Sequence, residues 1–122
     1  MSARRLAPWV ELQFAIGAAI RTGAVEPPKE LVYHAQRSQP LIRNAARSDD
    51  ERVMLASLNA LRELTLAWVE CDADLKPTLR ANVVAAFGLV NVWPVELVAQ
   101  ACSNAEEIRA ERAKSYRERH RA

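Results

Sequence analysis

The stretch that decides the fold is residues 48–70, SDDERVMLASLNALRELTLAWVE. It opens with Ser48 followed three residues later by Glu51, the capping-box pattern in which each side chain hydrogen-bonds the backbone N–H of the other residue. Acidic residues in this first turn also suit the positive end of the helix dipole. Five side chains then recur at helical spacing on one face: Met54, Leu58, Leu61, Thr65 and Trp68. The pattern predicts a central core helix that runs to about Glu70.

Shorter helices are predicted on the N-terminal side of this core helix. The first begins near Pro8, a residue suited to a first helical turn, and ends at Gly23, a residue suited to a C-terminal cap. A second helix opens at Pro28, and the Ser-Gln-Pro sequence of residues 38–40 interrupts the chain after it. Residues 41–47, LIRNAAR, are predicted to form a third short helix.

Three further helices are predicted on the C-terminal side. Asp74 is placed to cap the first of them, and Pro77 lies in its first turn, where a missing N–H does little harm. Residues 83–90 of that helix are apolar on nearly all sides. A short helix is expected at residues 94–100. Residues 103–106, Ser-Asn-Ala-Glu, then form a second capping box, which predicts a separate final helix.

These elements together predict the fold class. We expect an all-α protein, one compact helical bundle of five to seven helices that forms a single domain over residues 1–122. Residues 1–7 are expected to form a flexible basic arm. Apolar residues nearly vanish after Ile108, so residues 104–122 are expected to form a charged C-terminal helix that projects from the bundle.

Composition excludes several classes of protein. Half of the residues are apolar, but the longest strongly apolar run, residues 83–90, contains a glycine and is too short to cross a bilayer. The first residues show no signal-peptide pattern, which predicts a cytoplasmic protein without a membrane partner. Cys71 and Cys102 are therefore expected to be unpaired thiols that fill packing positions.

Signatures of catalysis and of bound cofactors are absent from the sequence. No glycine-rich phosphate loop or HExxH motif occurs, and His34 and His120 are isolated from other metal-ligating residues. Glu70, Asp72 and Asp74 form the one carboxylate cluster; a turn and a helix cap account for it, and a two-carboxylate metal site is the alternative. We expect no catalytic residue, no metal and no cofactor.

The charges are distributed unevenly along the chain. The net charge of +2 arises from +4 over residues 1–48, −6 over residues 49–111 and +4 over residues 112–122. Two basic ends around an acidic middle indicate either a polyanionic partner or a head-to-tail contact between copies. Arginine outnumbers lysine by fourteen to three, which suits phosphate contacts but is also what a GC-rich genome produces.

The basic residues are the candidate binding site. Helical spacing places four residues of the final helix on one stripe, with a tyrosine able to stack on an exposed base, and the remaining candidates lie in the N-terminal arm and around residues 37–47. The predicted nucleic-acid-binding residues are Arg4, Arg5, Arg37, Arg43, Arg47, Arg109, Arg112, Tyr116 and Arg119. A solvated polar surface explains the same pattern without any partner.

Two resemblances to known families bear on function. Residues 19–31, AIRTGAVEPPKEL, resemble the opening of the winged-helix regulators of the GntR family, but the recognition helix and two-stranded wing that should follow are not visible. The whole profile, a short, helical, arginine-rich chain without catalytic motifs, resembles the small helical subunit of CRISPR ribonucleoprotein effector complexes. That resemblance implies a non-enzymatic, antiviral subunit that stacks along a complex and supports the guide–target duplex or the displaced strand.

We therefore expect a non-catalytic helical subunit of a nucleic-acid-containing assembly. Its arginines would contact an RNA or DNA backbone, and its apolar or acidic faces would pack on other protein subunits or on further copies of the chain. The alternative is a protein–protein interaction or inhibitor module of phage or plasmid origin with no nucleic-acid contact. That module would bind through the apolar helix at residues 83–92 and through Trp93.

Overall fold

Helices account for the regular structure of the chain. The computed structural model describes residues 8–41 and 48–120, and within these ranges it contains five α-helices, one 3-10 turn and no strand. The helices are α1 (Pro8–Thr22), α2 (Lys29–Arg37), α3 (Asp49–Glu70), α4 (Lys76–Val90) and α5 (Val95–Arg119), and the turn, η2, is Ala73–Leu75. The all-α prediction is confirmed. The helix predicted at 41–47 lies, apart from Leu41, outside the described residues.

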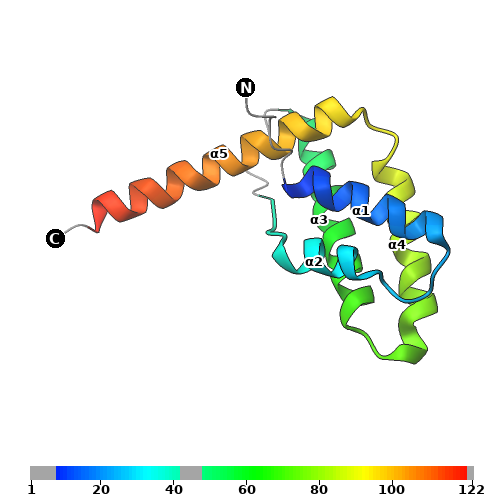
Figure 1. The fold of residues 1–122 in the computed structure, drawn as a ribbon. Helices are drawn as coiled ribbons and strands as arrows, with labels where there is room; N and C mark the ends of the chain where they lie inside the picture. The colour runs from blue at the N-terminus through cyan, green and yellow to red at the C-terminus, as the bar shows by residue number, and fades with distance from the viewer. Residues whose placement is uncertain (1–7, 42–47, 121–122) are drawn as a thin grey trace, which may run out of the picture.

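α3 is the central helix, as predicted. The side chain of Ser48 accepts a 3.1 Å hydrogen bond from the N–H of Glu51. The reciprocal half of the capping box is not formed, because Glu51 Oε1 is buried without a hydrogen-bond partner among the described residues. α2, α4 and α5 all contact α3, and Figure 1 shows α4 beside it. The predicted face is buried, together with Leu55, which helical spacing predicts to broaden it: the buried residues of α3 are Met54, Leu55, Leu58, Leu61, Thr65 and Trp68.

The turn between α3 and α4 is closed by Lys76. Its side chain is buried, and Nζ donates hydrogen bonds of 2.8 Å and 3.0 Å to the carbonyl oxygens of Trp68 and Val69. These carbonyls lie in the last turn of α3, where no helical N–H remains to satisfy them. The prediction that Asp74 caps α4 is wrong. Asp74 lies within η2, and the N-cap position of α4 is taken by Leu75, which has no side-chain capping bond.

The loop after α1 is fixed by side chains of α3 and α4. Gly23 has a φ of 73°, the left-handed conformation that glycine adopts readily at the end of a helix. Trp68 Nε1 donates a 2.9 Å hydrogen bond to the carbonyl oxygen of Val25, and Arg80 Nε donates another of 2.9 Å to that of Ala24. The predicted end of the first helix is confirmed, and the loop lies against the ends of α3 and α4.

The segment after α2 is attached to α3 through its backbone. Asn59 Oδ1 accepts a 2.7 Å hydrogen bond from the N–H of Leu41, and Asn59 Nδ2 donates a 3.0 Å bond to the Leu41 carbonyl oxygen. Arg62 Nε donates a 2.9 Å bond to Ser38 Oγ. These bonds hold residues 38–41 beside the middle of α3, close to the place where α5 crosses.

The C-terminal part of the chain differs from the prediction. α5 is one continuous helix from Val95 to Arg119, whereas the sequence predicts a short helix at 94–100 and a second one from the capping box at 103–106. One apolar face continues through the predicted capping box at residues 103–106. Its buried residues, at helical spacing, are Val98, Ala101, Cys102 and Ala105. Burial of this face favours an uninterrupted helix, and the expected start of the final helix near residue 104 is wrong.

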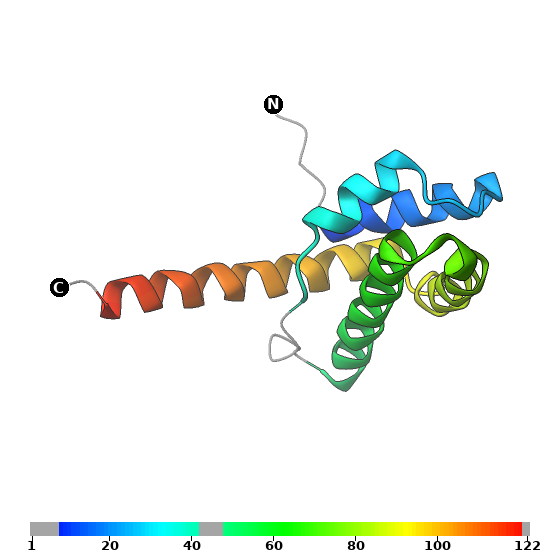
Figure 2. The same ribbon diagram turned by 90° about the horizontal axis from the view of Figure 1, so that it is seen from below.

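α5 leaves the other helices and extends beyond them. Figure 1 shows its C-terminal part well separated from every other helix, and Figure 2, seen from below, shows the same separation. Among residues 8–41 and 48–120, no single helix combines the length and the hydropathy needed to cross a bilayer. η2 and α4 meet both criteria only together with α5, as a pair bent by 99°.

Candidate nucleic-acid interface

The candidate interface centres on the exposed end of α5. Pro94 precedes the helix, and the first turns of α5 are held against the core by Val98, Cys102 and Ala105. From Glu111 to His120 every residue is exposed. We call residues 111–120 the α5 tail. Because the tail shares one continuous helix with the buried first turns, its direction is set by the core.

Four candidate residues of α5 lie on one stripe of the helix, as the sequence predicts, but they differ in surroundings. Arg109, Arg112, Tyr116 and Arg119 are separated by three, four and three residues, which keeps them on one helical face. Arg109 is partly buried and donates a hydrogen bond from Nη2 to the carbonyl oxygen of Pro40. Arg112 and Arg119 are exposed. The structure thus separates Arg109, which anchors α5 to the core, from the two outer arginines.

Tyr116 presents an aromatic ring in the middle of the tail. Its side chain is 60% exposed, and its ring stacks on that of His120 with centroids 4.0 Å apart and planes at 24°. His120 Nδ1 is 2.9 Å from the Tyr116 carbonyl oxygen. The sequence predicts no role for His120; the four-residue spacing of two aromatic rings on a helix was the available signal. The stack covers one face of the Tyr116 ring and leaves the other face exposed between Arg112 and Arg119.

The charges of the tail have few internal partners. Among the described residues, ion pairs are formed by Arg52 with Asp49 and by Arg62 with Glu63, and none involves α5. Within the tail, Lys114 lies three residues after Glu111 and four before Glu118, spacings suited to helical pairs, but neither pair is formed. A helix that is polar on all sides and has few such pairs is only weakly stable alone, so binding of a partner would stabilise the tail.

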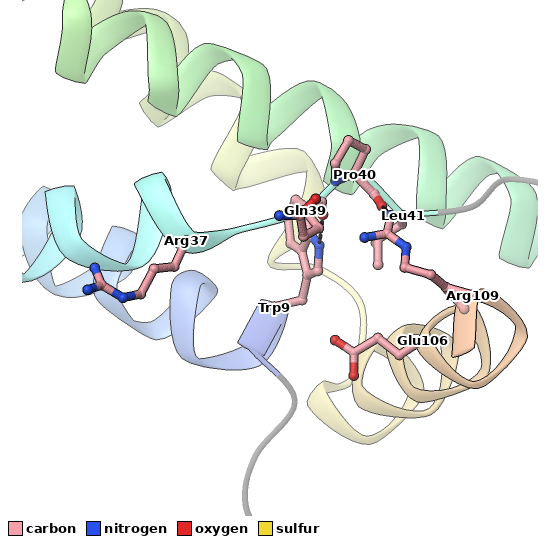
Figure 3. Close-up of a pocket in the computed structure, with 8 residues that line it drawn as sticks. Trp9, Arg37, Gln39, Pro40, Leu41, Glu106 and Arg109 are labelled. Carbon is pink, nitrogen blue, oxygen red and sulfur yellow. Dashed lines mark hydrogen bonds between the residues drawn. The ribbon is translucent and has the colours of Figure 1, made fainter. Parts of the chain in front are cut away.

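A small cavity lies at the root of the tail, between α5, the N-terminal end of α1 and the segment after α2 (Figure 3). Its volume is about 100 Å³, and both Arg37 and Arg109 line it. Trp9 forms one wall and donates a 2.9 Å hydrogen bond from Nε1 to the Gln39 carbonyl oxygen. The fold therefore brings together two predicted site residues that are distant in sequence.

The two arginines at this cavity do not converge. The guanidinium group of Arg37 lies 3.7 Å from the centroid of the Tyr33 ring, a cation–π contact, and Figure 3 shows it directed away from Arg109. Arg109 instead extends toward Pro40 and Leu41 (Figure 3). Arg37 is exposed, so as a candidate ligand it is separate from the arginines of α5.

Glu106 adds a carboxyl group to the same cavity. Partial burial of this carboxyl group raises its pKa above the ordinary value, and the neighbouring Arg109 lowers it in part. The pKa of the nearby Cys102 thiol is raised to about 12, mainly by burial and secondarily by the negative charge of Glu106. The α5 side of the cavity thus pairs a carboxyl group with Arg109, which leaves the exposed outer arginines as the better sites for an anion.

Four predicted site residues, Arg4, Arg5, Arg43 and Arg47, lie outside the described residues. Their assignment to a nucleic-acid contact stays a prediction. No group of three or more His, Cys, Asp or Glu side chains in the described ranges is arranged to hold a metal ion. Glu70, Asp72 and Asp74 are exposed around η2.

Comparison of the chain with protein-family models, with curated proteins and with solved structures finds no match.

Proposed function

We propose that this chain is a non-catalytic helical subunit of a nucleic-acid-containing assembly, in which the α5 tail lies against an RNA or DNA backbone. The observation that carries the proposal is the tail itself, ten consecutive exposed residues that extend from the core with Arg112 and Arg119 on one face. Guanidinium groups bind phosphates with two parallel hydrogen bonds, so each of the two outer arginines can hold one phosphate.

Tyr116 supplies the second kind of contact. An exposed aromatic ring between two arginines offers a stacking surface to any unpaired base, whatever its sequence. The stack with His120 covers one face of the ring and leaves the other face available to a base. The proposed binding is therefore independent of base sequence and favours single-stranded segments. The resemblance to small subunits of CRISPR ribonucleoprotein complexes agrees with such a role, and within the proposal it names the class of assembly.

A pull-down of the tagged chain from its native host, divided into samples with and without nuclease, tests the proposal. We expect nucleic acid to co-purify together with a fixed set of proteins, and we expect nuclease to release part of that set. A partner protein that is retained equally in both samples, with no nucleic acid present, would contradict the proposal.

One observation favours the alternative, a protein–protein interaction module. Residues 81–95 contain no charged residue, and the outer side of this segment exposes Leu89 (71%) and Val92 (75%). Trp93, by contrast, is partly buried and packs on the core, so it is not available as the predicted anchor. Binding through Leu89 and Val92 would persist at high salt, whereas phosphate binding weakens steeply as salt is added.

A further inference from the structure

A second cavity lies on the opposite part of the molecule from the tail, between α1, the end of α4 and the start of α5. Its volume is about 140 Å³, and Val10, Phe14, Phe87 and Val95 give it apolar walls. A Cβ atom added at Gly17 would lie 3.1 Å from Phe87 Cζ, so the glycine lets this ring approach α1. An apolar cavity of roughly 150 Å³ accepts a benzene ring. The dimensions therefore suit one aromatic side chain.

The cavity also contains one buried polar group, the side-chain amide of Gln13. Gln13 lines the cavity and is only 6% exposed, yet its Oε1 atom has no hydrogen-bond partner within the described residues. Buried amide oxygens are nearly always paired, so an unpaired one indicates a missing donor. A ring that carries an O–H or N–H group would both fill the space and supply that donor. This requirement selects tyrosine or tryptophan over phenylalanine.

The surface next to the cavity is acidic. An open hollow of about 440 Å³ adjoins it along α1 and shares Phe14 and Arg21 with it. Glu11 and Glu30 line this hollow, and the other titratable groups there are Arg21 and His34. Two carboxylates against one permanent cation favour a ligand with positive charges beside its aromatic ring. We call the cavity and the hollow together the α1 groove.

The chain itself contains a segment with this chemistry. Among the described residues, the exposed side chains of the selected types, tyrosine and tryptophan, are Tyr33 and Tyr116. The Tyr33 ring is covered by the guanidinium group of Arg37, and the Tyr116 ring is covered on one face by His120. Tyr116, however, lies on the projecting tail, one helical turn from Arg112 and from Arg119. The tail extends away from its own α1 as a continuous helix (Figures 1 and 2), so it reaches a groove on another molecule rather than its own.

We propose that the α5 tail of one copy docks in the α1 groove of a second copy. The Tyr116 ring fills the cavity and its hydroxyl group donates to Gln13 Oε1, while Arg112 and Arg119 face the carboxylates of Glu11 and Glu30. In α1, Glu11 of the hollow and Phe14 of the cavity are three residues apart, about 4.5 Å along the helix axis. Tyr116 and Arg119 are the same distance apart along α5, so Arg119 can face Glu11 while Tyr116 enters the cavity.

This contact has two consequences. Each copy offers one tail and one groove, so the association is head-to-tail and extends into longer chains of copies or closes into a ring. The tail is also the segment that the proposed function assigns to nucleic acid, so nucleic acid and a second copy compete for it. The docking itself does not depend on the proposed function.

Sedimentation velocity of the purified, nucleic-acid-free chain at low salt tests the docking. We expect the average mass to rise with protein concentration and to pass the mass of a dimer. Tyr116→Phe, which removes only the donor, should weaken association about tenfold, and Tyr116→Ala should abolish it. Tyr33→Phe is the matched control and should change nothing. Because all these side chains are exposed, circular dichroism should show an unchanged helix content.

A charge exchange gives a sharper test. Glu11→Lys with Glu30→Lys makes the groove basic, and Arg112→Glu with Arg119→Glu makes the tail acidic. Each double variant should be monomeric alone, because the tail of one copy and the groove of the next carry charges of the same sign. An equal mixture of the two variants should associate, because each tail then meets a groove of opposite charge. A wild-type chain that stays monomeric, or a mixture that fails to associate, would overturn the inference.

The result also separates this inference from the proposed function. A dimer that survives Tyr116→Ala would overturn the docking and point to an interface elsewhere, for example through Leu89 and Val92. Nucleic-acid binding by a chain that never self-associates would support the proposed function alone. Association through Tyr116 without any nucleic-acid binding would support the docking alone.

Discussion

Arg109 donates a hydrogen bond to the carbonyl oxygen of Pro40, and this bond joins α5 to the segment that follows α2. The two residues come from distant parts of the sequence, and they meet where the buried part of α5 gives way to the tail. Arg109 therefore has a structural role in attaching α5 to the core, although helical spacing places it in the same stripe as the proposed nucleic-acid ligands.

Arg109→Met should destabilise the protein. The substitution keeps the aliphatic stem but leaves the Pro40 carbonyl without its donor, and we expect the free energy of unfolding to fall by about 1 kcal/mol. Urea denaturation followed by circular dichroism measures this change. Arg112→Met is the matched control and should shift the unfolding free energy by less than about 0.5 kcal/mol, since Arg112 is exposed. Equal effects of the two substitutions would contradict the anchoring role.

Lys76→Met should destabilise the turn between α3 and α4. The substitution removes both hydrogen bonds from Nζ, so the carbonyl groups of Trp68 and Val69 lose a buried donor. We expect a loss of about 2 kcal/mol, because hydrogen bonds to a charged donor are among the stronger ones. Thermal unfolding of the variant measures it. Lys29→Met, at an exposed position of α2, should leave the melting temperature nearly unchanged.

The two cysteines should differ in reactivity. Cys102 is buried and its pKa is raised to about 12, so at pH 8 almost none of it is thiolate. Cys71 is partly exposed and should react first with a thiol-specific reagent such as dithiobisnitrobenzoate. We expect one thiol to be titrated in the native protein and the second only after guanidinium is added. Cys71→Ser should abolish the first phase, and a fast reaction in that variant would refute the assignment.

The raised pKa of Cys102 also predicts how stability depends on pH. The thiol has an ordinary value of 9.0 and a folded-state value of about 12, so between these limits the unfolded state has lost the proton while the folded state retains it. The contribution to stability is therefore fully present below pH 9 and is lost as the pH rises toward 12. Cys102→Ala should make the free energy of unfolding fall less steeply over this range.

Nucleic-acid binding should depend on salt through the tail. If Arg112 and Arg119 each neutralise one phosphate, their joint replacement by glutamine should lower the slope of log K against log salt by about 1.4 for a single strand. Fluorescence anisotropy with one labelled oligonucleotide over a salt series measures that slope. Replacing Arg52, which is exposed on α3 and paired with Asp49, is the matched control. An unchanged slope in the double variant would exclude Arg112 and Arg119 as phosphate ligands.

The core could be predicted from the sequence because its signals are local. The face of α3 from Met54 to Trp68 follows from helical periodicity, and the end of α1 follows from Gly23. The course of α5 could not be predicted in the same way. Ser103 and Glu106 have the spacing of a helix start, but Ala101 and Ala105 are buried on both sides of that point. Burial of this apolar face favours one continuous helix over a new helix start.

The candidate site was predictable in part. The stripe from Arg109 to Arg119 depends only on helical spacing, and the continuous helix confirms that these residues share a face. The anchoring role of Arg109 and the unpaired oxygen of Gln13 depend on what other helices bring near them, which no local pattern contains.

The continuity of α5 makes the helix a lever. Its fulcrum is the anchored segment that ends at Arg109, and its long arm reaches Arg119, about 15 Å further along the axis. A tilt of about 10° at the fulcrum displaces the tip by about 3 Å, close to the rise between successive residues of an extended strand. Small repacking around Cys102 and Ala105 is thus magnified into a step at the tip, and force on the tip is transmitted back to the core.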